Sequence, residues 1–408
     1  MAAARPAAVS PERLLTGAVL VLVCFGLVMV YSASSAEALL GAGGPTDFVV
    51  RQTIFAVIGL GAYFVCARIR PPALRRLAGP GMGVAAFLLL VVLIPGIGVS
   101  VNGSRRWLSL GSFAQLQPSE LAKVGLALWL AVAIARDPRR LRTMRGLVPF
   151  LGVTAAIALL ILVEPDMGTA AVIVMIAVSM LIVGGARLRH LGGLGIGLGL
   201  LGLIAIAMEP YRRERLLAFL DPWHDPSGVG FQTIQAQVAF GSGGISGVGL
   251  GDGLQKAFYL PEAHTDMILA TVGEELGLLG VMAVVVAFGI VAVAGYRIAL
   301  GAGDLHRQLL AAGLTTMVVS QAAINMGAVL GVMPVTGVPL PFVSYGGSSL
   351  VILLASTGIL VNIAQRSRQV PRLRVVPGED ASGDRGRGDG RSRDARPGRG
   401  RGVARARG

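Results

Sequence analysis

Residues 259–295 read "YLPEAHTDMILATVGEELGLLGVMAVVVAFGIVAVAG", a short polar segment followed by a long apolar run. The run that starts at Met267 is long enough to cross a bilayer, because a spanning helix needs about 20 predominantly apolar residues. Glu262, His264 and Asp266 stand directly before the run. The stretch therefore predicts a membrane helix with two acids and an imidazole at its edge.

The rest of the chain is equally apolar. Of its 408 residues, 54% are hydrophobic and 14% are charged, and the mean hydropathy is +0.71. Repeated apolar runs of about 18 or more residues indicate membrane helices, whereas a β-barrel would show short alternating segments. Cys24 and Cys66 lie in or at the end of such runs and suggest neither a disulfide nor a metal site. The predicted class is an all-α polytopic membrane protein.

Ten apolar segments are candidate membrane spans, and an even number places both termini on one side. Arg-rich connections follow the second, fourth, sixth and eighth spans, so these connections and both termini are predicted to be cytoplasmic. The remaining five loops then face outward, and the largest comprises residues 209–266, between the seventh and eighth spans. The spans are predicted near 14–34, 48–67, 80–97, 118–136, 146–163, 168–185, 190–208, 267–295, 308–330 and 347–365.

The spans divide the chain into a cytoplasmic tail of residues 1–13, a membrane domain of 14–366 and a C-terminal tail of 367–408. From Arg366 to the end there are 13 Arg and 5 acidic residues and almost no apolar ones. Such a composition cannot bury a core and predicts disorder. The basic tail could tether nucleic acid or lipid headgroups. We favour a plain cytoplasmic tail that follows the positive-inside rule, with no nucleic-acid partner.

Polar and glycine-rich motifs gather in the outward loops, which predicts a site that opens outward. Arg105 and Arg106 flank Trp107, and a second group of arginines follows residue 209. Lys123 is predicted a turn inside the membrane, where it needs an acid or an anionic ligand. It could simply pair with Glu120, three residues earlier. The glycine-rich segment 241–253 could approach a phosphate or could be a flexible turn.

Asp266 is the strongest candidate for a catalytic group. Thr265 resembles a helix N-cap, which would make Asp266 the first helical residue. Asp266 could then only complement the helix N-terminus, for about 0.3–1 kcal/mol, or could accept a proton from an attacking hydroxyl. Glu274 lies two turns further into the helix, where it would line a wet groove. Its neighbouring glycines could alternatively pack against another helix. Asp166, in "EPD", is a second candidate with a structural or cation-related role.

Five segments together resemble the SEDS family of membrane proteins (FtsW, RodA and SpoVE). They occur in family order over about residues 14–366 and are closer to the division member than to the elongation member. Met267 departs from the phenylalanine that the family usually has there. The segments are "NGSRRWLSLGSFAQLQPSELAK", "EPDMGTA", "DPWHDPSGVGFQTIQAQVAFGSGG", "YLPEAHTDMILATVGEELG" and "PLPFVSYGGSSL".

The resemblance implies an inverting peptidoglycan glycosyltransferase that polymerises lipid II during cell division and releases undecaprenyl diphosphate. It places the catalytic aspartate at Asp266. It also implies a divalent cation (Mg²⁺ or Mn²⁺), a class B penicillin-binding protein and other division proteins as partners, and a location in the cytoplasmic membrane at the septum. With the loop chemistry above, the candidate substrate-binding residues are Lys123, Arg105, Arg106, Arg213, Glu274, His264 and Ser344.

Other functions remain open from the sequence alone. A lipid II flippase would need polar groups at several depths, and deep polar residues are few. An elongation-type polymerase would share the motifs, and a non-catalytic scaffold would tolerate the loss of Asp266. The one-sided distribution of polar groups favours the enzyme.

The predicted topology can be tested by labelling single cysteines in a cysteine-free variant. A cysteine in place of Ser227 is expected to react with a membrane-impermeant maleimide from outside intact cells, because its loop faces outward. A cysteine in place of Arg140 is the control, and should react only after the membrane is opened. Labelling of the Ser227 position only from the cytoplasmic side would reverse the topology.

Overall fold

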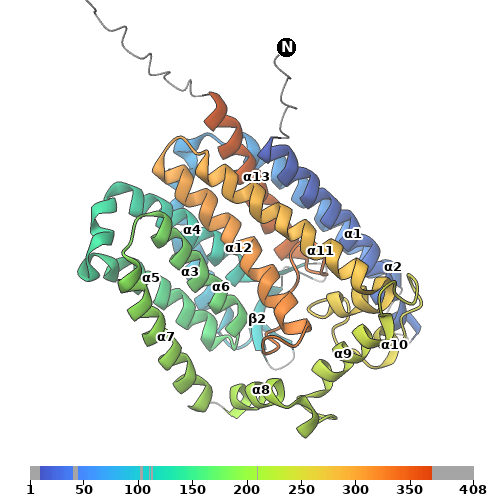
Figure 1. Cartoon of the computed structure of the whole chain (residues 1–408). Coiled ribbons are helices and arrows are strands. Elements are labelled where there is room, and N and C mark those ends of the chain that lie inside the picture. The colour runs from blue at the N-terminus through green and yellow to red at the C-terminus, as the bar shows by residue number, and fades with distance from the viewer. Residues whose placement is uncertain are drawn as a thin grey trace, which may run out of the picture. The chain divides into compact units, whose positions relative to one another are not determined.

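The computed structural model describes residues 10–39, 45–101, 104–109, 111, 114–208 and 210–369. The predicted C-terminal tail from 370 onward lies outside this part of the chain. Within it the protein is predominantly helical, and ten long helices occupy the positions of the ten predicted spans (Figure 1). They are α1 (Pro11–Leu39), α2 (Pro45–Arg68), α3 (Pro71–Val92), α4 (Pro118–Arg136), α5 (Met144–Val163), α6 (Met167–Val183), α7 (Leu188–Met208), α11 (Ile268–Leu300), α12 (Leu305–Val329) and α13 (Gly347–Gln369).

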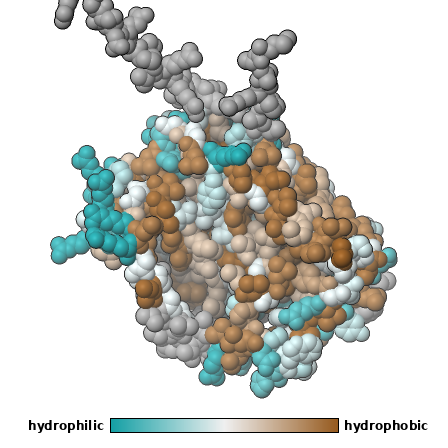
Figure 2. Space-filling view, in the orientation of Figure 1, coloured by the Kyte–Doolittle hydropathy of each residue, from teal (hydrophilic) through white to brown (hydrophobic). Residues whose placement is uncertain are grey.

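Length and hydropathy support the membrane assignment. Among the described residues, 8 helices are long and apolar enough to cross a bilayer, and α6 is apolar but shorter. Apolar side chains cover much of the face seen in Figure 2. The predicted class, an all-α polytopic membrane protein, is therefore confirmed.

The third helix begins earlier than predicted. The apolar run suggested a span over 80–97, but α3 starts at Pro71, after an extended Arg70, and contains Pro80. Proline suits the first turn of a helix because its missing N–H needs no partner there. The polar segment after Pro71 is thus helical although it contributes no hydropathy signal, and residues 93–97 form turns.

The central helices carry the polar side chains. α12 is the most enclosed of the candidate spans, and it packs against α4, α6 and α11. Its buried Gln321 and Asn325 face other protein segments rather than lipid. This is expected, since polar groups inside a membrane are tolerated where protein supplies hydrogen-bond partners.

Short elements replace the long loops that were predicted between helices. A three-stranded antiparallel sheet precedes α4, and four short helices fill most of the segment between α7 and α11. The sheet and α8 to α10 lie at the end of the helices away from the start of α1 (Figure 1). These elements are β1 (Gly98–Val101), β2 (Ser104–Ser109), β3 (Gln115–Leu116), α8 (Pro210–Leu220), η2 (Pro222–His224), α9 (Phe231–Gly243) and α10 (Gln255–Phe258); η1 (Pro138–Arg142) joins α4 to α5.

Candidate active site

Asp266 lies in a tight turn just before α11. The helix begins at Ile268 with Met267 as its N-cap, so the predictions of Thr265 as the cap and Asp266 as the first helical residue were wrong. Glu262 has a positive φ of 57°, and its carbonyl accepts the N–H groups of Thr265 and Met267. The Thr265 hydroxyl donates to the Glu262 carboxylate at 2.7 Å instead of capping the helix.

An amide on α12 joins this turn to the loop before α13. Asn325 Nδ2 donates to the carbonyl of Asp266 at 2.7 Å and to that of Val338 at 2.8 Å. A methyl group added at Gly337 would lie 3.9 Å from Asp266 Oδ2 and 3.7 Å from Arg106 Nη1. The aspartate and the guanidinium therefore flank the same glycine, although the sequence separates them widely.

Arg106 is held near Asp266 by backbone carbonyls. Its guanidinium donates through Nε to the backbone carbonyl of Glu164, at 3.1 Å, and through Nη2 to that of Pro165, and neither acceptor carries a charge. Burial, and then the Asp166 charge, raise the pKa of Glu164 to about 8 against the effect of Arg106. Glu164 is thus largely uncharged near neutral pH. Arg105 is exposed on the other side of β2, as alternation along a strand requires.

The electrostatic surroundings of Asp266 suit a proton acceptor. The residue is half-buried, and this burial together with the neighbouring Glu262 charge raises its pKa to about 7, while Arg215 lowers it. Arg215 reaches this region from α8, where its Nη1 donates to the carbonyl of Val335 at 3.0 Å. Arg213, the predicted residue, has an exposed side chain two positions earlier on α8. Arg215 belongs to the group of arginines after residue 209, from which only Arg213 was predicted to bind substrate.

A cavity of about 250 Å³ adjoins Arg215. Its wall includes Phe219 from α8, Phe231 and Gln232 from α9, and Pro261 from the turn that carries Asp266. Its size is close to the lower end of ligand pockets, about 300 Å³. Two rings, an amide and a guanidinium provide apolar faces and hydrogen-bond donors to one bound group.

His264 and Ser344 hold the loops of the site together. The His264 ring packs on Phe48 at 4.9 Å and on Tyr345 at 5.6 Å between centroids, and its carbonyl accepts the Tyr345 N–H. The Ser344 hydroxyl accepts the N–H of Leu340 at 2.8 Å. Asp166 accepts the N–H of Thr169 and caps α6. A direct contact of His264 or Ser344 with substrate remains a prediction.

Lys123 is enclosed in the protein and is fully buried. Its Nζ donates to Glu120 Oε1 at 2.8 Å and to Gln321 Oε1 at 2.5 Å, and Gln321 donates in turn to the carbonyl of Pro339. The structure thus contains the ion pair that sequence analysis left as the alternative. A role of Lys123 in binding diphosphate stays a prediction.

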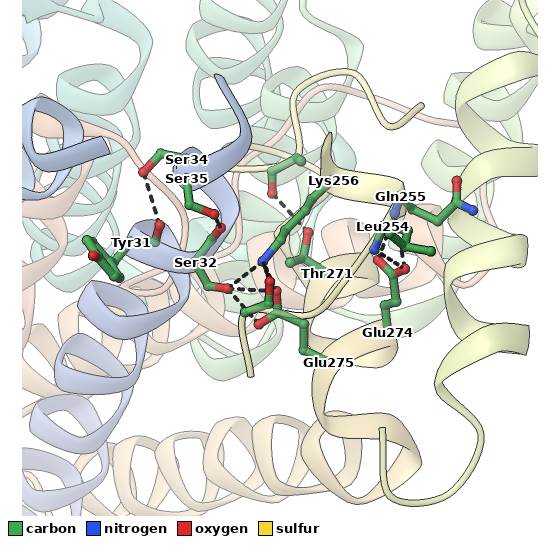
Figure 3. Close-up of polar contacts among 12 residues, drawn as sticks. Tyr31, Ser32, Ser34, Ser35, Leu254, Gln255, Lys256, Thr271, Glu274 and Glu275 are labelled. Carbon is green, nitrogen blue, oxygen red and sulfur yellow. Dashed lines mark hydrogen bonds and ion pairs between the residues drawn. The ribbon is translucent and has the colours of Figure 1, made fainter. Parts of the chain in front are cut away.

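Glu274 also has protein partners. Its carboxylate accepts the N–H groups of Leu254 and Gln255, at the start of α10, which are the partners that a buried carboxylate needs. A contact of Glu274 with substrate remains a prediction. The neighbouring Glu275 binds Lys256, the second lysine of the chain, which sequence analysis passed over (Figure 3).

The predicted divalent cation has no ready-made protein cage. Among the described residues, no group of three or more His, Cys, Asp or Glu is arranged to hold a metal ion. Mg²⁺ is often bound through one or two carboxylates together with substrate phosphates. Asp266 fits that mode as a single carboxylate, so the cation remains a proposal.

Fold and site together define a polytopic helical membrane protein with a carboxylate-centred site at one end of its helices. A model of the cell cycle protein family of FtsW, RodA and SpoVE matches residues 12–369. The chain therefore belongs to this family.

Named relatives match over nearly their whole lengths. The stage V sporulation protein E of Bacillus subtilis is 42% identical over 88% of this chain and 98% of its own. A probable peptidoglycan glycosyltransferase FtsW of Geobacter metallireducens is 43% identical over 86% of this chain and 93% of its own. Another, from Thioalkalivibrio sulfidiphilus, is 45% identical over 88% of this chain and 91% of its own.

Solved structures share the fold. A chain from a peptidoglycan synthase complex, in a study of the coordination of polymerization and crosslinking, has a TM-score of 0.72 and 33% identity over 87% of this chain and 98% of its own. The rod shape determining protein RodA of Thermus thermophilus has a TM-score of 0.63 and 30% identity, over 86% of this chain and 96% of its own.

The role of Lys123 can be tested with single and double variants. If Lys123 binds diphosphate, both Lys123→Met and the Glu120→Gln, Lys123→Met double variant should lose lipid II polymerisation, while Lys123→Arg keeps part of it because the charge survives. Removing both members of a purely structural pair should instead restore what the single variant loses. Recovery of polymerisation by the double variant would assign Lys123 to structure alone.

Proposed function

We propose that the protein is a peptidoglycan glycosyltransferase that polymerises lipid II into glycan strands during cell division. The observation that carries the proposal is the Asp266 carboxylate, which has a pKa raised to about 7 and lies beside Arg106 and Arg215. The names of the FtsW relatives and the match to a chain from a peptidoglycan synthase complex support it.

The chemistry follows from these charges. Asp266 accepts the proton of the acceptor GlcNAc 4-hydroxyl as its oxygen attacks the anomeric carbon of MurNAc at the end of the growing strand. The new glycosidic bond forms on the face opposite the departing undecaprenyl diphosphate, so the configuration inverts. A general base with a pKa near the working pH is largely ionised and still has enough driving force to accept a proton. Arg106 and Arg215 stabilise the negative charge that develops on the leaving diphosphate.

The cavity beside Arg215 is the proposed place for a sugar residue of the substrate. Phe219 and Phe231 offer apolar faces to a sugar ring, and the Gln232 amide can hydrogen-bond an acetamido group. A divalent cation, if bound by Asp266 and the diphosphate, would supply further positive charge. Arg105 and Arg213, both exposed, are placed to meet the substrate or the growing strand before it reaches Asp266.

Two alternatives are less well supported. A flippase needs a polar path through the bilayer, but Lys123 and Lys256, both deeply buried, are occupied by Glu120 and Glu275. An elongation-type polymerase would use the same site. The FtsW relatives, at up to 45% identity, favour division over the elongation role of RodA, at 30%.

The partners and the location are proposed on the same basis. Outward topology of the site would place polymerisation on the external face of the cytoplasmic membrane, at the septum. A class B penicillin-binding protein would crosslink the strands made here. The complex to which the similar solved chain belongs couples polymerization and crosslinking, which supports such a partner.

Replacement of the base tests the function directly. Asp266→Asn is expected to lower the rate of lipid II polymerisation by about 10²–10⁴, because an amide cannot accept the proton. The assay uses purified protein with its partner, and a melting curve checks that the variant is folded. An Asp137→Asn variant, in the exposed Asp137–Arg140 pair, serves as the control. Polymerisation at the normal rate by folded Asp266→Asn would refute the assignment.

The pH dependence tests the electrostatics of the same carboxylate. A base must be ionised, so activity is expected to rise with pH through about 7, the pKa of Asp266. The acid limb of the pH–activity profile is the range in which activity rises with pH. Glu262→Gln removes a charge that raises the pKa of Asp266, so it should move this acid limb to lower pH. Arg215→Gln removes a charge that lowers it and should move the limb upward, whereas Arg215→Lys should leave it nearly in place. Identical limbs in all variants would exclude Asp266 as the titrating group.

A further inference from the structure

The helix that follows Asp266 is interrupted at Gly277. Within α11, Gly277 has φ 63° and ψ −162°, a backbone conformation that glycine adopts readily. An interruption frees backbone N–H and C=O groups, and where these are buried they must find partners within the protein. The interruption lies nine residues beyond Ile268, well below the turn that carries Asp266.

The glycine-rich segment 241–253 supplies those partners. The N–H groups of Val248 and Gly249 donate to the carbonyls of Glu274 and Glu275 at 3.0 and 3.1 Å. In the other direction, Leu278 and Leu279 donate to the carbonyls of Gly244 and Ile245 at 2.9 and 3.2 Å.

Glycine is needed because the two backbones nearly touch. A Cβ at Gly247 would lie 2.1 Å from the carbonyl oxygen of Glu275, and one at Gly243 would lie 1.9 Å from that of Gly273. Gly247 also has a positive φ of 81°. The glycines that could have approached a phosphate therefore approach α11.

The side chains of the same two glutamates hold the chain where it leaves this segment. Glu274 Oε1 accepts the N–H groups of Leu254 and Gln255 at 2.8 and 3.0 Å. Glu275 forms a buried ion pair with Lys256, and its two carboxylate oxygens accept the Ser32 hydroxyl of α1 at 2.6 and 2.7 Å (Figure 3). Lys256 Nζ also donates to the carbonyl of Gly251 at 2.8 Å.

These contacts close a loop. Residues 254–256 at one end are fastened to residues 274 and 275 at the other, and Asp266 lies between them. Glu274 is six residues from Ile268, where the helix begins, which is about 9 Å at 1.5 Å per helical residue. The closed end therefore does not contact the reacting atoms at Asp266, but it restrains the chain on both sides of the carboxylate.

We propose that Lys256, Glu274 and Glu275 are positioning residues that hold Asp266 in register with Arg106 and Arg215. The proposal rests on the proposed function, in which Asp266 is the base. Buried ion pairs often add little stability relative to apolar replacements of similar size, but they can specify one geometry. Here the pair joins α1, α10 and the interruption of α11 at a single point.

The test separates geometry from stability with a double variant. Lys256→Met and Glu275→Gln each leave one buried charge without its partner and should lower both the melting temperature and kcat. The Lys256→Met, Glu275→Gln double variant has no such charge and should recover the melting temperature. Its kcat should stay about 100-fold low, the cost of a shift on the order of 1 Å at a reacting group. KM should change little, because the substrate-binding groups are intact.

A Glu274→Gln variant gives an independent measurement if the single charge variants do not fold. It preserves the shape and the ion pair but weakens the acceptor for Leu254 and Gln255, and it should lower kcat at an unchanged melting temperature. The acid limb of the pH profile should move in both the double variant and Glu274→Gln, because Asp266 shifts relative to Glu262 and Arg215. Asp137→Asn is again the control and should change none of these quantities.

The outcomes distinguish the two proposals. If the double variant regains both its melting temperature and full kcat, with an unmoved acid limb, the ion pair is structural and the positioning proposal fails. That result would leave the function intact provided that Asp266→Asn is inactive. Activity of folded Asp266→Asn would instead refute the function, and with it any need to position this carboxylate.

Discussion

A buried backbone N–H or C=O group needs a hydrogen-bond partner, and the interruption of α11 at Gly277 has to satisfy this constraint. Segment 241–253 does so with four backbone hydrogen bonds, and this pairing fixes where the chain must run before it returns to α11. The path then passes α10 and the turn that carries Asp266. The pairing at the interruption and the turn with the candidate base therefore belong to one continuous stretch of chain.

The two buried lysines have the same kind of partners. The two lysines of the chain, Lys123 and Lys256, are each paired with a glutamate and with one further polar side chain, Gln321 or Ser32. Each cluster joins helices and a loop. By contrast, Arg106 donates to carbonyl oxygens and so keeps its charge for an anion. The two buried lysines are thus paired with carboxylates, whereas the printed partners of Arg106 are uncharged carbonyl oxygens.

The site is built from segments that are far apart in sequence. Asn325 is 59 residues from Asp266 in the sequence, and its side-chain amide donates hydrogen bonds to the backbone carbonyls of Asp266 and Val338. Arg106 reaches the same place from β2, and Arg215 from α8. Such convergence lets a small movement of any one segment alter the surroundings of the carboxylate. It also explains why the pKa of Asp266 depends on Glu262 and Arg215 together.

The sequence by itself determined the membrane class, the approximate positions of the long helices other than the start of α3, and the selection of Asp266 as the candidate base. Hydropathy is a local property of a segment, and the motif around Asp266 is contiguous. Tertiary structure alone decided that the helix starts at Ile268, that Glu274 binds backbone N–H groups, and that Arg215 rather than the exposed Arg213 influences Asp266. It also decided that the glycines of 241–253 meet a helix rather than a phosphate. The physical reason is that burial and hydrogen-bond partners depend on which distant segments pack together: Ser32 and Glu275 are 243 residues apart, and no local pattern joins them.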